Sequence, residues 1–361
     1  MKLLFVSKRH PQQRDLLERP YGRFHYLPVA LATMGHEVRV LLCSHRRMAN
    51  AILERDGVRW SSHDVLALGP RLLVATLARE AEAFRPDWTV GCSDAWYGWL
   101  AQMLTQRAGG RLGIDAYDNY EAYMRWNLPL HWKWRRAVRA ADLVTAAGPQ
   151  LAERLQSHCH GDRTVEILPM AADPCFVPME RASCRDRLGL PQDAPLIGYS
   201  GGWASNRGTH ILLECFALVR QARPDARLVL SGRPPAEACA TPGVIALGYL
   251  DDALLPVLLN ALDVSCTITA NSAFGRYSYP AKLCEAMACA VPVVATATAP
   301  VRWMLHDDPR FLAEVGSAAS LAERILERLP MGRVDYGVLP SWADVARQMD
   351  ALLTAGYGVS V

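Results

Sequence analysis

Residues 275–296 read GRYSYPAKLCEAMACAVPVVAT, a stretch that predicts a tight loop, a short helix and then a buried strand. Pro280 has the fixed φ angle that suits the first turn of a helix, where the N–H group that proline lacks would have no partner. Gly275 and Ser278 suit the loop before that turn. The helix start is therefore expected to point backbone N–H groups forward, an arrangement that attracts phosphate.

Charged side chains around this helix start extend the argument to a nucleotide. Lys282 and Arg276 add positive charge for a phosphate. Glu285 follows Lys282 by three residues and falls on the same helical face. Its carboxylate can accept hydrogen bonds from two ribose hydroxyls while the lysine meets the phosphates. The alternative interpretation is a surface lysine and glutamate pair on an ordinary helix.

Length and charge limit the class of protein. The chain has 361 residues, of which 51% are hydrophobic, and this fits two well-packed domains of ordinary size. Its 39 basic and 36 acidic residues give a net charge of +3. So small an excess argues against a nucleic-acid-binding protein, whose affinity would come from phosphate contacts.

Cysteine usage and the first residues indicate the compartment. The ten cysteines include no C-x-x-C pair, and several stand in apolar runs, as expected of small buried side chains in a reducing cytoplasm. The opening MKLLFVSKRH has a short apolar run, too short for a signal peptide, and no stretch reaches transmembrane length. The expectation is a cytoplasmic protein, either soluble or peripherally attached at the inner face of the membrane.

Apolar runs alternate with helical patterns in the first half of the chain. Residues 3–7 predict a strand, 24–34 a helix and 37–43 a second strand, which together make a βαβ unit. Further strands are predicted at 88–92 and 111–116, with amphipathic stretches between them. Strands that alternate with helices predict a parallel sheet covered on both faces.

A proline-rich linker separates this series from a second one. Residues 168–178 read LPMAADPCFVP and interrupt the pattern, after which strands and helices alternate again. The sequence thus predicts an α/β protein with a first domain over residues 1–170, a second over 171–340 and a final helical segment over 341–361.

Carboxylates stand at the ends of predicted strands, where parallel sheets bind ligands. The segment IDAYDNYEAY supplies Asp115, Asp118 and Glu121 as candidates for a catalytic base. Asp118 is the first choice, and Asp94 is a weaker candidate at another strand end. The alternative for Asp115 and Asp118 is that they cap the following helix. No His, Cys and Asp residues show the spacing of metal ligands.

Two basic segments of the first half have alternative interpretations. Arg9, Arg14, Arg19 and Arg23 line the loop after the first strand, where an acceptor would enter, or else form a solvated loop. The helical stretch HWKWRRAVR, residues 131–139, mixes tryptophan with arginine. It either lies on an anionic membrane surface or is a core helix with one solvated face.

The order of several motifs resembles a known family. The series from GGWASNRG through ARLVLSG, VIALGY and LLPVLLNALDV to PAKLCEAMACAVPVVAT looks like the carboxyl-terminal domain of family 4 (group 1) GT-B glycosyltransferases. The stretch YGRFHYLPVALATMGHEVRVL is similar to the family's first helix and second strand. The likeness implies two Rossmann-like domains that face each other across a cleft, the first for the acceptor and the second for a nucleotide-sugar. It also implies no bound metal and no cofactor, and a final helix that packs back on the first domain.

The same resemblance assigns residues to sites. Glu285 matches the family's ribose-binding glutamate, Lys282 a lysine near the diphosphate, and Arg207 stands where the family has a phosphate-binding lysine. The implied donor site consists of Gly201, Gly202, Arg207, Arg233, Tyr249, Arg276, Tyr277, Ser278, Tyr279, Lys282, Leu283 and Glu285. The implied acceptor site consists of Arg9, Tyr21, Gly22, Arg23 and Asp94.

Three positions depart from the family pattern, and at one of them the arginine often found a few residues before the phosphate-binding lysine has become glycine. Tyr277 replaces the first of two glutamates that many members carry. Ala290 replaces the usual glycine after the helix, where a left-handed residue is expected, so the cap there is expected to differ in shape. The nucleotide site is less affected than the sugar contacts and the stereochemistry.

The resulting prediction is a metal-independent, retaining glycosyltransferase. It would move a sugar from a nucleoside diphosphate sugar to a hydroxyl of a glycan, a lipid-linked acceptor or a small molecule, with peripheral membrane contact and no nucleic-acid partner. The alternatives are a GT-B sugar-nucleotide epimerase, which needs no separate acceptor, and a non-catalytic GT-B subunit that binds a partner or ligand.

Overall fold

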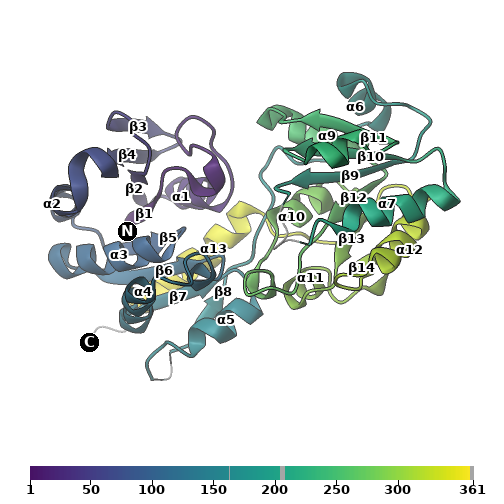
Figure 1. Cartoon of the computed structure of the whole chain (residues 1–361). Coiled ribbons are helices and arrows are strands. Elements are labelled where there is room, and N and C mark those ends of the chain that lie inside the picture. Colours follow the sequence, from purple (N-terminus) through teal and green to yellow (C-terminus); the bar gives the residue numbers. More distant parts are fainter. Residues whose placement is uncertain (162, 204–207, 358–361) are drawn as a thin grey trace. The chain divides into compact units, whose positions relative to one another are not determined.

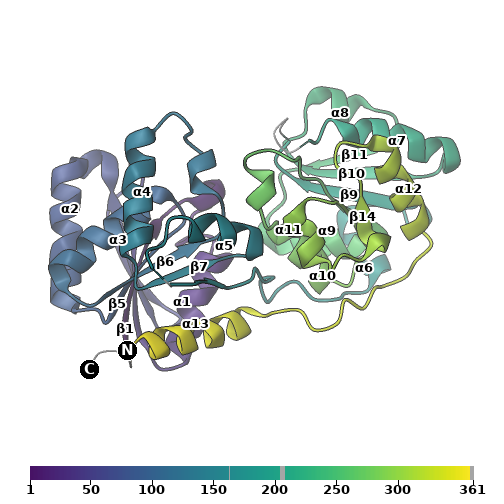
Figure 2. The same cartoon turned by 90° about the horizontal axis from the view of Figure 1, so that it is seen from below.

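The computed structural model describes residues 1–161, 163–203 and 208–357. Its chain forms two compact units, the first of Met1–Met170 with Pro340–Val361 and the second of Ala171–Leu339. Helix α13 (Trp342–Tyr357) therefore belongs to the first unit although it follows the second in sequence, as the yellow end of the chain in Figures 1 and 2 shows.

The first unit is built on an eight-stranded sheet of order β3-β4-β2-β1-β5-β6-β7-β8. Every neighbouring pair is parallel except β3 and β4. Buried strands such as Trp88–Cys92 have all residues inside, which is the expected pattern when helices cover both faces. Its elements are β1 (Lys2–Lys8), α1 (Arg23–Thr33), β2 (Glu37–Ser44), β3 (Ala51–Arg55), β4 (Val58–Asp64), α2 (Val65–Phe84), β5 (Trp88–Cys92), α3 (Ala95–Ala108), β6 (Arg111–Ala116), η2 (Tyr120–Ala122), α4 (Leu128–Ala140), β7 (Leu143–Ala146), α5 (Pro149–Gln156) and β8 (Val165–Ile167).

The hairpin of β3 and β4 was not predicted from the sequence. Its strands are joined at Asp56 and Gly57, which both have positive φ angles of 55° and 74°. An Asp-Gly pair with this geometry favours a two-residue turn between antiparallel strands. The signal was therefore present in the sequence, and the hairpin adds an antiparallel edge to a sheet expected to be wholly parallel.

Helix α13 packs back on the first unit, as predicted for the final helix. Its buried side chains include Val345, Met349 and Leu353. The ring of His36, just after α1, lies 2.9 Å through Nε2 from the Asp350 carboxylate. Because α13 contributes apolar contacts and this polar contact, it completes the first domain rather than forming a separate one.

The second unit is built on a six-stranded parallel sheet of order β11-β10-β9-β12-β13-β14. Helices cover this sheet over two hydrophobic clusters. Its elements are α6 (Arg181–Leu188), β9 (Leu196–Gly201), α7 (Ile211–Ala222), β10 (Arg227–Gly232), α8 (Ala236–Ala240), β11 (Val244–Gly248), α9 (Leu255–Ala261), β12 (Val264–Thr267), η5 (Gly275–Tyr277), α10 (Ala281–Ala288), β13 (Val293–Thr296), α11 (Ala299–Met304), β14 (Leu312–Ala313) and α12 (Ala318–Arg328).

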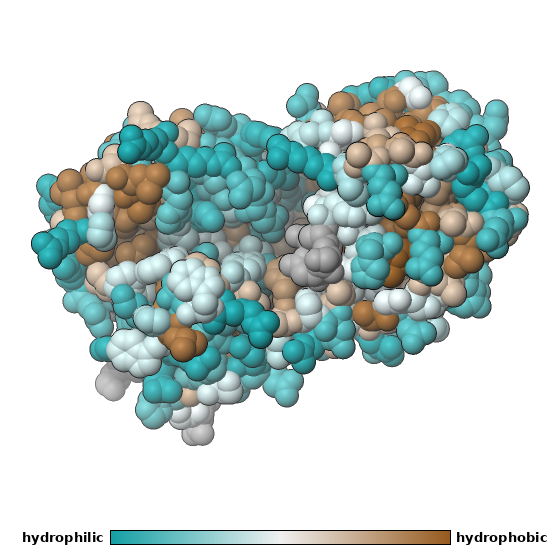
Figure 3. All heavy atoms as spheres, in the orientation of Figure 1, coloured by the Kyte–Doolittle hydropathy of each residue, from teal (hydrophilic) through white to brown (hydrophobic). Residues whose placement is uncertain are grey.

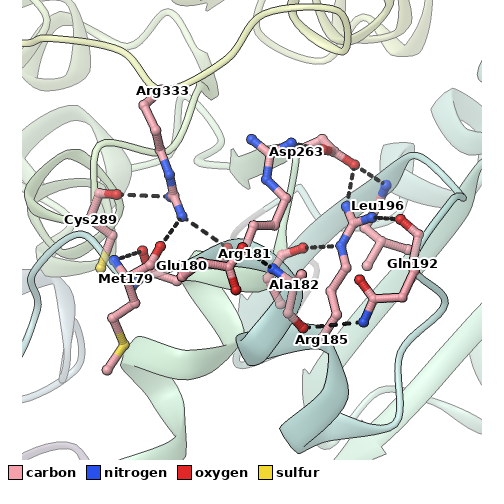
Figure 4. Close-up of polar contacts among 12 residues, drawn as sticks. Met179, Glu180, Arg181, Ala182, Arg185, Gln192, Leu196, Asp263, Cys289 and Arg333 are labelled. Atoms are coloured by element: carbon pink, nitrogen blue, oxygen red, sulfur yellow. Dashed lines mark hydrogen bonds and ion pairs between the residues drawn. The ribbon is translucent and has the colours of Figure 1, made fainter.

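A polar network secures the amino-terminal edge of this second sheet. Asp263, just before β12, accepts hydrogen bonds from Arg181 and Arg185, at 2.6 Å and 2.7 Å (Figure 4). Arg333 donates to the backbone oxygens of Cys289 and Met179. These contacts tie α6 and the segment after α12 to the sheet, so the network has a structural role.

The cap after α10 keeps the left-handed geometry despite the loss of glycine. Ala290 has a φ angle of 57°, and its N–H donates to Met287 at 2.8 Å. The expectation that alanine would reshape this cap is therefore wrong. Backbone contacts hold the strained residue in place, including one from Val334 N to its carbonyl oxygen at 2.9 Å.

Three whole-chain features bear on the sequence predictions. None of the ten cysteines, all within the described residues, forms a disulfide. Among the described helices, none has the length and hydropathy to cross a membrane. Nor does the described part of the chain bring three His, Cys, Asp or Glu side chains into a group that could hold a metal ion.

Candidate functional site

The carboxyl edge of the second sheet brings together the residues predicted to bind a phosphate. Strands β9 and β10 end side by side, with Ser200 paired to Ser231 and Gly201 paired to Gly232. Ser231 Oγ donates to Ser200 Oγ at 3.0 Å, and Lys282 Nζ donates to the same oxygen at 3.3 Å. The lysine of α10 thus lies against the ends of two strands far from it in sequence.

Two glycines make this close approach sterically feasible. A Cβ atom on Gly201 would lie 3.0 Å from Lys282 Nζ, and one on Gly232 would lie 2.8 Å from the Gly201 carbonyl oxygen. Their φ angles of 153° and 105° also disfavour other residues. The structure places an ammonium group beside two strand ends that carry no side chain beyond glycine, which is the chemistry that a diphosphate requires.

Gly275 allows the tight loop before α10, as the sequence predicted. A Cβ atom there would lie 2.0 Å from the Ala270 carbonyl oxygen, and the Gly275 N–H donates to Ser272 Oγ at 3.0 Å. Thr296 Oγ1 both accepts from Thr269 N and donates to Thr269 O, at 2.7 Å each. These contacts fix the loop that leads to the first turn of α10.

The remaining predicted donor residues differ in exposure. Glu285 is half-buried on α10, Ser278 and Tyr279 are buried in the loop, and Tyr277 is half-buried beside them. The exposed residues are Arg233, Arg276, Tyr249 and Gly202, the last of which accepts from the Tyr199 hydroxyl through its carbonyl oxygen at 3.0 Å. Arg207 lies outside the described residues.

Leu283 is a correction to the predicted donor site. Its side chain is fully buried in the hydrophobic cluster beneath the sheet. A leucine on the inner face of α10 stabilises the helix by packing and presents nothing polar to a nucleotide. Ser200, in contrast, was not predicted, although as the last strand residue before the glycine pair it occupies the position where strand ends meet ligands.

The carboxyl edge of the first sheet holds Asp115 in a buried ion pair. The guanidinium of Arg23 meets both carboxylate oxygens of Asp115, at 2.6 Å and 2.7 Å, and Thr145 Oγ1 donates to one of them at 2.7 Å. Arg23 also donates to the carbonyl oxygens of Leu168 and Pro169. Both side chains are 2% exposed. Asp115 as a base and Arg23 as an acceptor contact are therefore wrong, because each is enclosed by the other.

Glu121 is likewise tied into the structure. Its carboxylate accepts from Arg135 Nε at 2.6 Å and from Arg154 Nη2 at 2.5 Å. Burial by itself raises the pKa of Glu121, but the neighbouring His158, Arg135 and Arg154 lower it to about 2. A carboxylate held so strongly in its ionised form is a poor proton acceptor, so Glu121 as a base is also a correction.

The predicted acceptor contact of Arg9 is a further correction. Its guanidinium lies 2.9 Å from the Asp15 carboxylate and donates to Ser62 at 3.1 Å, and the side chain is buried. His10 lies 3.2 Å from the same carboxylate. The arginine thus ties the loop after β1 to strand β4, and its charge is neutralised inside the protein.

Asp118 lies at the same edge in a different environment. It is buried, and the Tyr123 hydroxyl donates to its Oδ2 at 2.6 Å. Tyr117, which burial leaves with a raised pKa, lies with its hydroxyl 3.3 Å from that of Tyr123. The neutral Tyr123 hydroxyl thus holds one oxygen of this carboxylate in place.

Asp94 follows β5 and is only partly buried. Its Oδ1 atom is buried with no hydrogen-bond partner in the described residues. Burial raises the pKa of Asp94, whereas the charge of Lys8 opposes that change. Lys8 ends β1, which is next to β5, and His45 follows β2, which is the strand beyond β1. Both residues therefore stand at the same edge of the sheet, and neither was predicted from the sequence.

Tyr21 and Gly22 precede α1. Tyr21 is buried with its hydroxyl directed at the Pro11 carbonyl oxygen, and the Arg14 guanidinium lies 4.0 Å from its ring. Gly22 has a φ angle of 62° and begins the helix that carries Arg23. The two residues shape the loop after β1 at this edge.

Sequence comparison finds relatives among known glycosyltransferases. Residues 194–330 match the family model described as Glycosyl transferases group 1. The phosphatidyl-myo-inositol mannosyltransferase of Propionibacterium freudenreichii subsp. shermanii is 33% identical over 230 residues, which are 63% of this chain and 55% of that protein. The chain spans about half the length of the curated relatives it matches.

Solved structures match over the whole chain. Sucrose-phosphate synthase from Thermosynechococcus elongatus has a TM-score of 0.75, with 17% identity and 100% of both chains covered. HepE from Anabaena, solved in complex with UDP, has a TM-score of 0.69, with 17% identity, and covers 99% of this chain and 97% of that one. Likeness at such identity shows the fold. The chain therefore has the two-domain GT-B fold, and residues 194–330 of its second domain match the model of the group 1 glycosyl transferases.

Proposed function

We propose that this protein is a glycosyltransferase that moves a sugar from a nucleoside diphosphate sugar to a hydroxyl of a glycan, lipid-linked or small-molecule acceptor. The observation that carries the proposal is the contact of Lys282 with Ser200 beside Gly201, at the carboxyl edge of the second sheet. This arrangement lies inside the family-matched residues. The UDP complex of HepE supports testing uridine nucleotides first.

The second domain would stabilise the leaving group. Breaking the bond between the anomeric carbon and the diphosphate places positive charge on the sugar and negative charge on the phosphates. Lys282 and the start of α10 meet that negative charge, with Arg276, Arg233 and Arg207 as further cations. Glu285 would accept hydrogen bonds from the ribose hydroxyls.

The first domain would position the acceptor hydroxyl, and Asp118 is the carboxylate proposed to contact it. In retaining transfer the departing diphosphate takes the hydroxyl proton and Asp118 orients the acceptor, whereas in inverting transfer Asp118 takes the proton. Asp94 is the second candidate, supported by its partnerless buried oxygen. We propose the retaining, metal-independent route.

Nucleotide binding tests the donor site directly. Titration calorimetry of the whole protein with UDP, GDP and dTDP should give binding to at least one of them. Lys282→Met should weaken the preferred nucleotide by about 10- to 100-fold, because a hydrogen bond from a charged group contributes roughly 1.5–3 kcal/mol. Arg302→Met is the matched control. Arg302 lies on α11 and pairs with Asp307, so this variant should leave the Kd of the nucleotide unchanged. A chain that binds none of the three is not the proposed enzyme.

Turnover separates the proposed reaction from its rivals. Asp118→Asn should remove turnover while nucleotide affinity stays at the wild-type value; wild-type turnover in this variant would remove Asp118 from the mechanism.

Proton NMR of the product gives the anomeric configuration. An epimerised sugar formed from the donor alone would favour an epimerase, and nucleotide binding without any turnover would favour a non-catalytic subunit. Activity lost in EDTA and restored by Mg²⁺ would contradict metal independence.

A further inference from the structure

Large apolar side chains on and before α4 are exposed to solvent. Trp126 is 79% exposed, Leu128 is 69% exposed and Trp132 is 61% exposed. These three residues, with Arg136 and Arg139, are here called the α4 patch. Exposed tryptophans are unusual, because burial of an aromatic side chain contributes about 1.5–3 kcal/mol.

The exposure is not the result of an incompletely packed helix. The inner face of α4 already buries Leu130, Trp134 and Val138 in the core of the first unit. Leu128 and Trp132 lie four residues apart on the opposite face. The helix therefore carries a second apolar surface that the first domain does not cover with described residues.

Positive charge surrounds this second surface. The sequence has no acidic residue between Glu121 and Asp142, whereas it has five basic ones there, Arg125, Lys133, Arg135, Arg136 and Arg139. The Arg136 guanidinium lies 5.6 Å from the Trp132 ring, so charge and aromatic area adjoin directly. Arg136 is exposed one turn beyond Trp132, and Arg139 is exposed about two turns beyond it.

We propose that the α4 patch docks this protein on an anionic phospholipid surface. Tryptophan is favoured at the level of lipid headgroups, and a helix with one apolar and basic outer face lies in that plane. Each arginine near an anionic leaflet contributes about 1 kcal/mol of attraction. Tyr123, three residues before Trp126, is 40% exposed, and its hydroxyl contacts Asp118. Docking would therefore bring lipid-linked acceptors towards the proposed acceptor edge.

A second exposed apolar area on the same domain serves as the comparison. Ile52, Leu66 and Leu72 are 65%, 57% and 50% exposed on β3 and α2, and hydrophobic side chains form a brown area over α2 in Figure 3. This area contains no exposed aromatic ring among these residues, and Glu54 stands on the same hairpin. It has the apolar area of a docking surface without the exposed tryptophans that lipid headgroups favour.

Vesicle sedimentation of the full chain tests the proposal. The wild-type protein should sediment with vesicles of phosphatidylcholine and phosphatidylglycerol and not with phosphatidylcholine alone. The double variant Arg136→Gln, Arg139→Gln should lower the partition coefficient about 30-fold, and Trp126→Ser with Trp132→Ser at least about tenfold. Leu66→Ser with Leu72→Ser is the matched control and should bind as the wild type does.

Several results would overturn the proposal. They are absence of vesicle binding, equal binding to neutral vesicles, and wild-type binding by either α4 double variant. Binding of polyglutamate without vesicles would assign the patch to an acidic protein partner instead. Thermal unfolding of each variant checks that the fold is intact. Calorimetry with UDP on the same variants keeps this test apart from the donor site, because nucleotide affinity should not change.

Discussion

The carboxyl edges of the two sheets carry different kinds of residue. In the first domain the edge carries buried ion pairs, such as Arg23 with Asp115 and Arg9 with Asp15. In the second it carries glycines, hydroxyl groups and Lys282. Both edges occupy the position where parallel sheets bind ligands. The same architecture thus offers one edge where several charges are paired inside the protein and one edge where glycines and hydroxyl groups surround a lysine.

The difference shows that a charged residue near a ligand-binding edge is not thereby a functional residue. Buried pairs fix the shape of the first edge, because each partner would be strongly destabilised alone. At the second edge small residues matter more, since they let a ligand and a lysine approach the strand ends. The buried pairs of the first edge should therefore respond to substitution through stability, and the glycines and Lys282 of the second edge through ligand affinity.

The largest expected effect is the loss of stability on breaking the Arg23–Asp115 ion pair. Arg23→Met should lower the free energy of unfolding by about 3–5 kcal/mol, because it leaves the Asp115 carboxylate buried without its partner. Urea unfolding measures the change. The double variant Arg23→Met, Asp115→Leu should recover much of the loss, since a buried pair can be replaced by apolar side chains. A single variant as stable as the wild type would break the comparison.

The second largest effect is expected in acid, which should weaken the ion pairs of Glu121 with Arg135 and Arg154. The pKa of Glu121 is lowered from 4.5 to about 2 in the folded protein, so the carboxylate stabilises the fold above about pH 4.5 and loses this effect as the pH falls towards 2. The difference sets an upper limit of about 3 kcal/mol. Unfolding measured from pH 6 downward should show a shallower acid dependence for Glu121→Gln than for the wild type. Parallel curves would contradict the role assigned to Arg135 and Arg154.

A smaller effect is expected on the nucleotide affinity of the second edge. Gly201→Ala should raise the Kd of the preferred nucleotide about tenfold, because the new Cβ atom would displace Lys282 Nζ, 3.0 Å away. Gly316→Ala is the control, since Gly316 also has a positive φ angle, 82°, but no atom within 4 Å of its Cβ position. If both variants bind nucleotide equally well, the glycine at the strand end has no special part in the site.

The smallest effect concerns the helix that carries Lys282. Ala290→Gly should stabilise the protein by about 0.5–1 kcal/mol, because glycine adopts the left-handed conformation of this cap without strain. Thermal unfolding measures the gain, and nucleotide affinity should stay the same. A destabilised variant would mean that the alanine methyl group contributes packing that exceeds the strain.

Much of the fold was predictable because parallel strands buried on two faces read as apolar runs. The residues of the candidate sites were less predictable, because their partners are distant in sequence. Arg23 and Asp115 lie 92 positions apart in sequence, and Lys282 and Ser200 lie 82 apart. Residue type and strand position indicated that Lys282 and Asp118 stand at ligand-binding edges. Which carboxylates meet an arginine depends on how helices and strands pack, and this decided against Asp115 and Glu121.

The membership of α13 in the first domain has a consequence for biosynthesis. The second domain is inserted between parts of the first, because residues on both sides of it build one unit. A growing chain therefore exposes the surface of α1 until the segment that contains Val345, Met349 and Leu353 has left the ribosome. The domain that is synthesised first should become resistant to protease last, and pulse proteolysis of ribosome-bound chains would reveal this order.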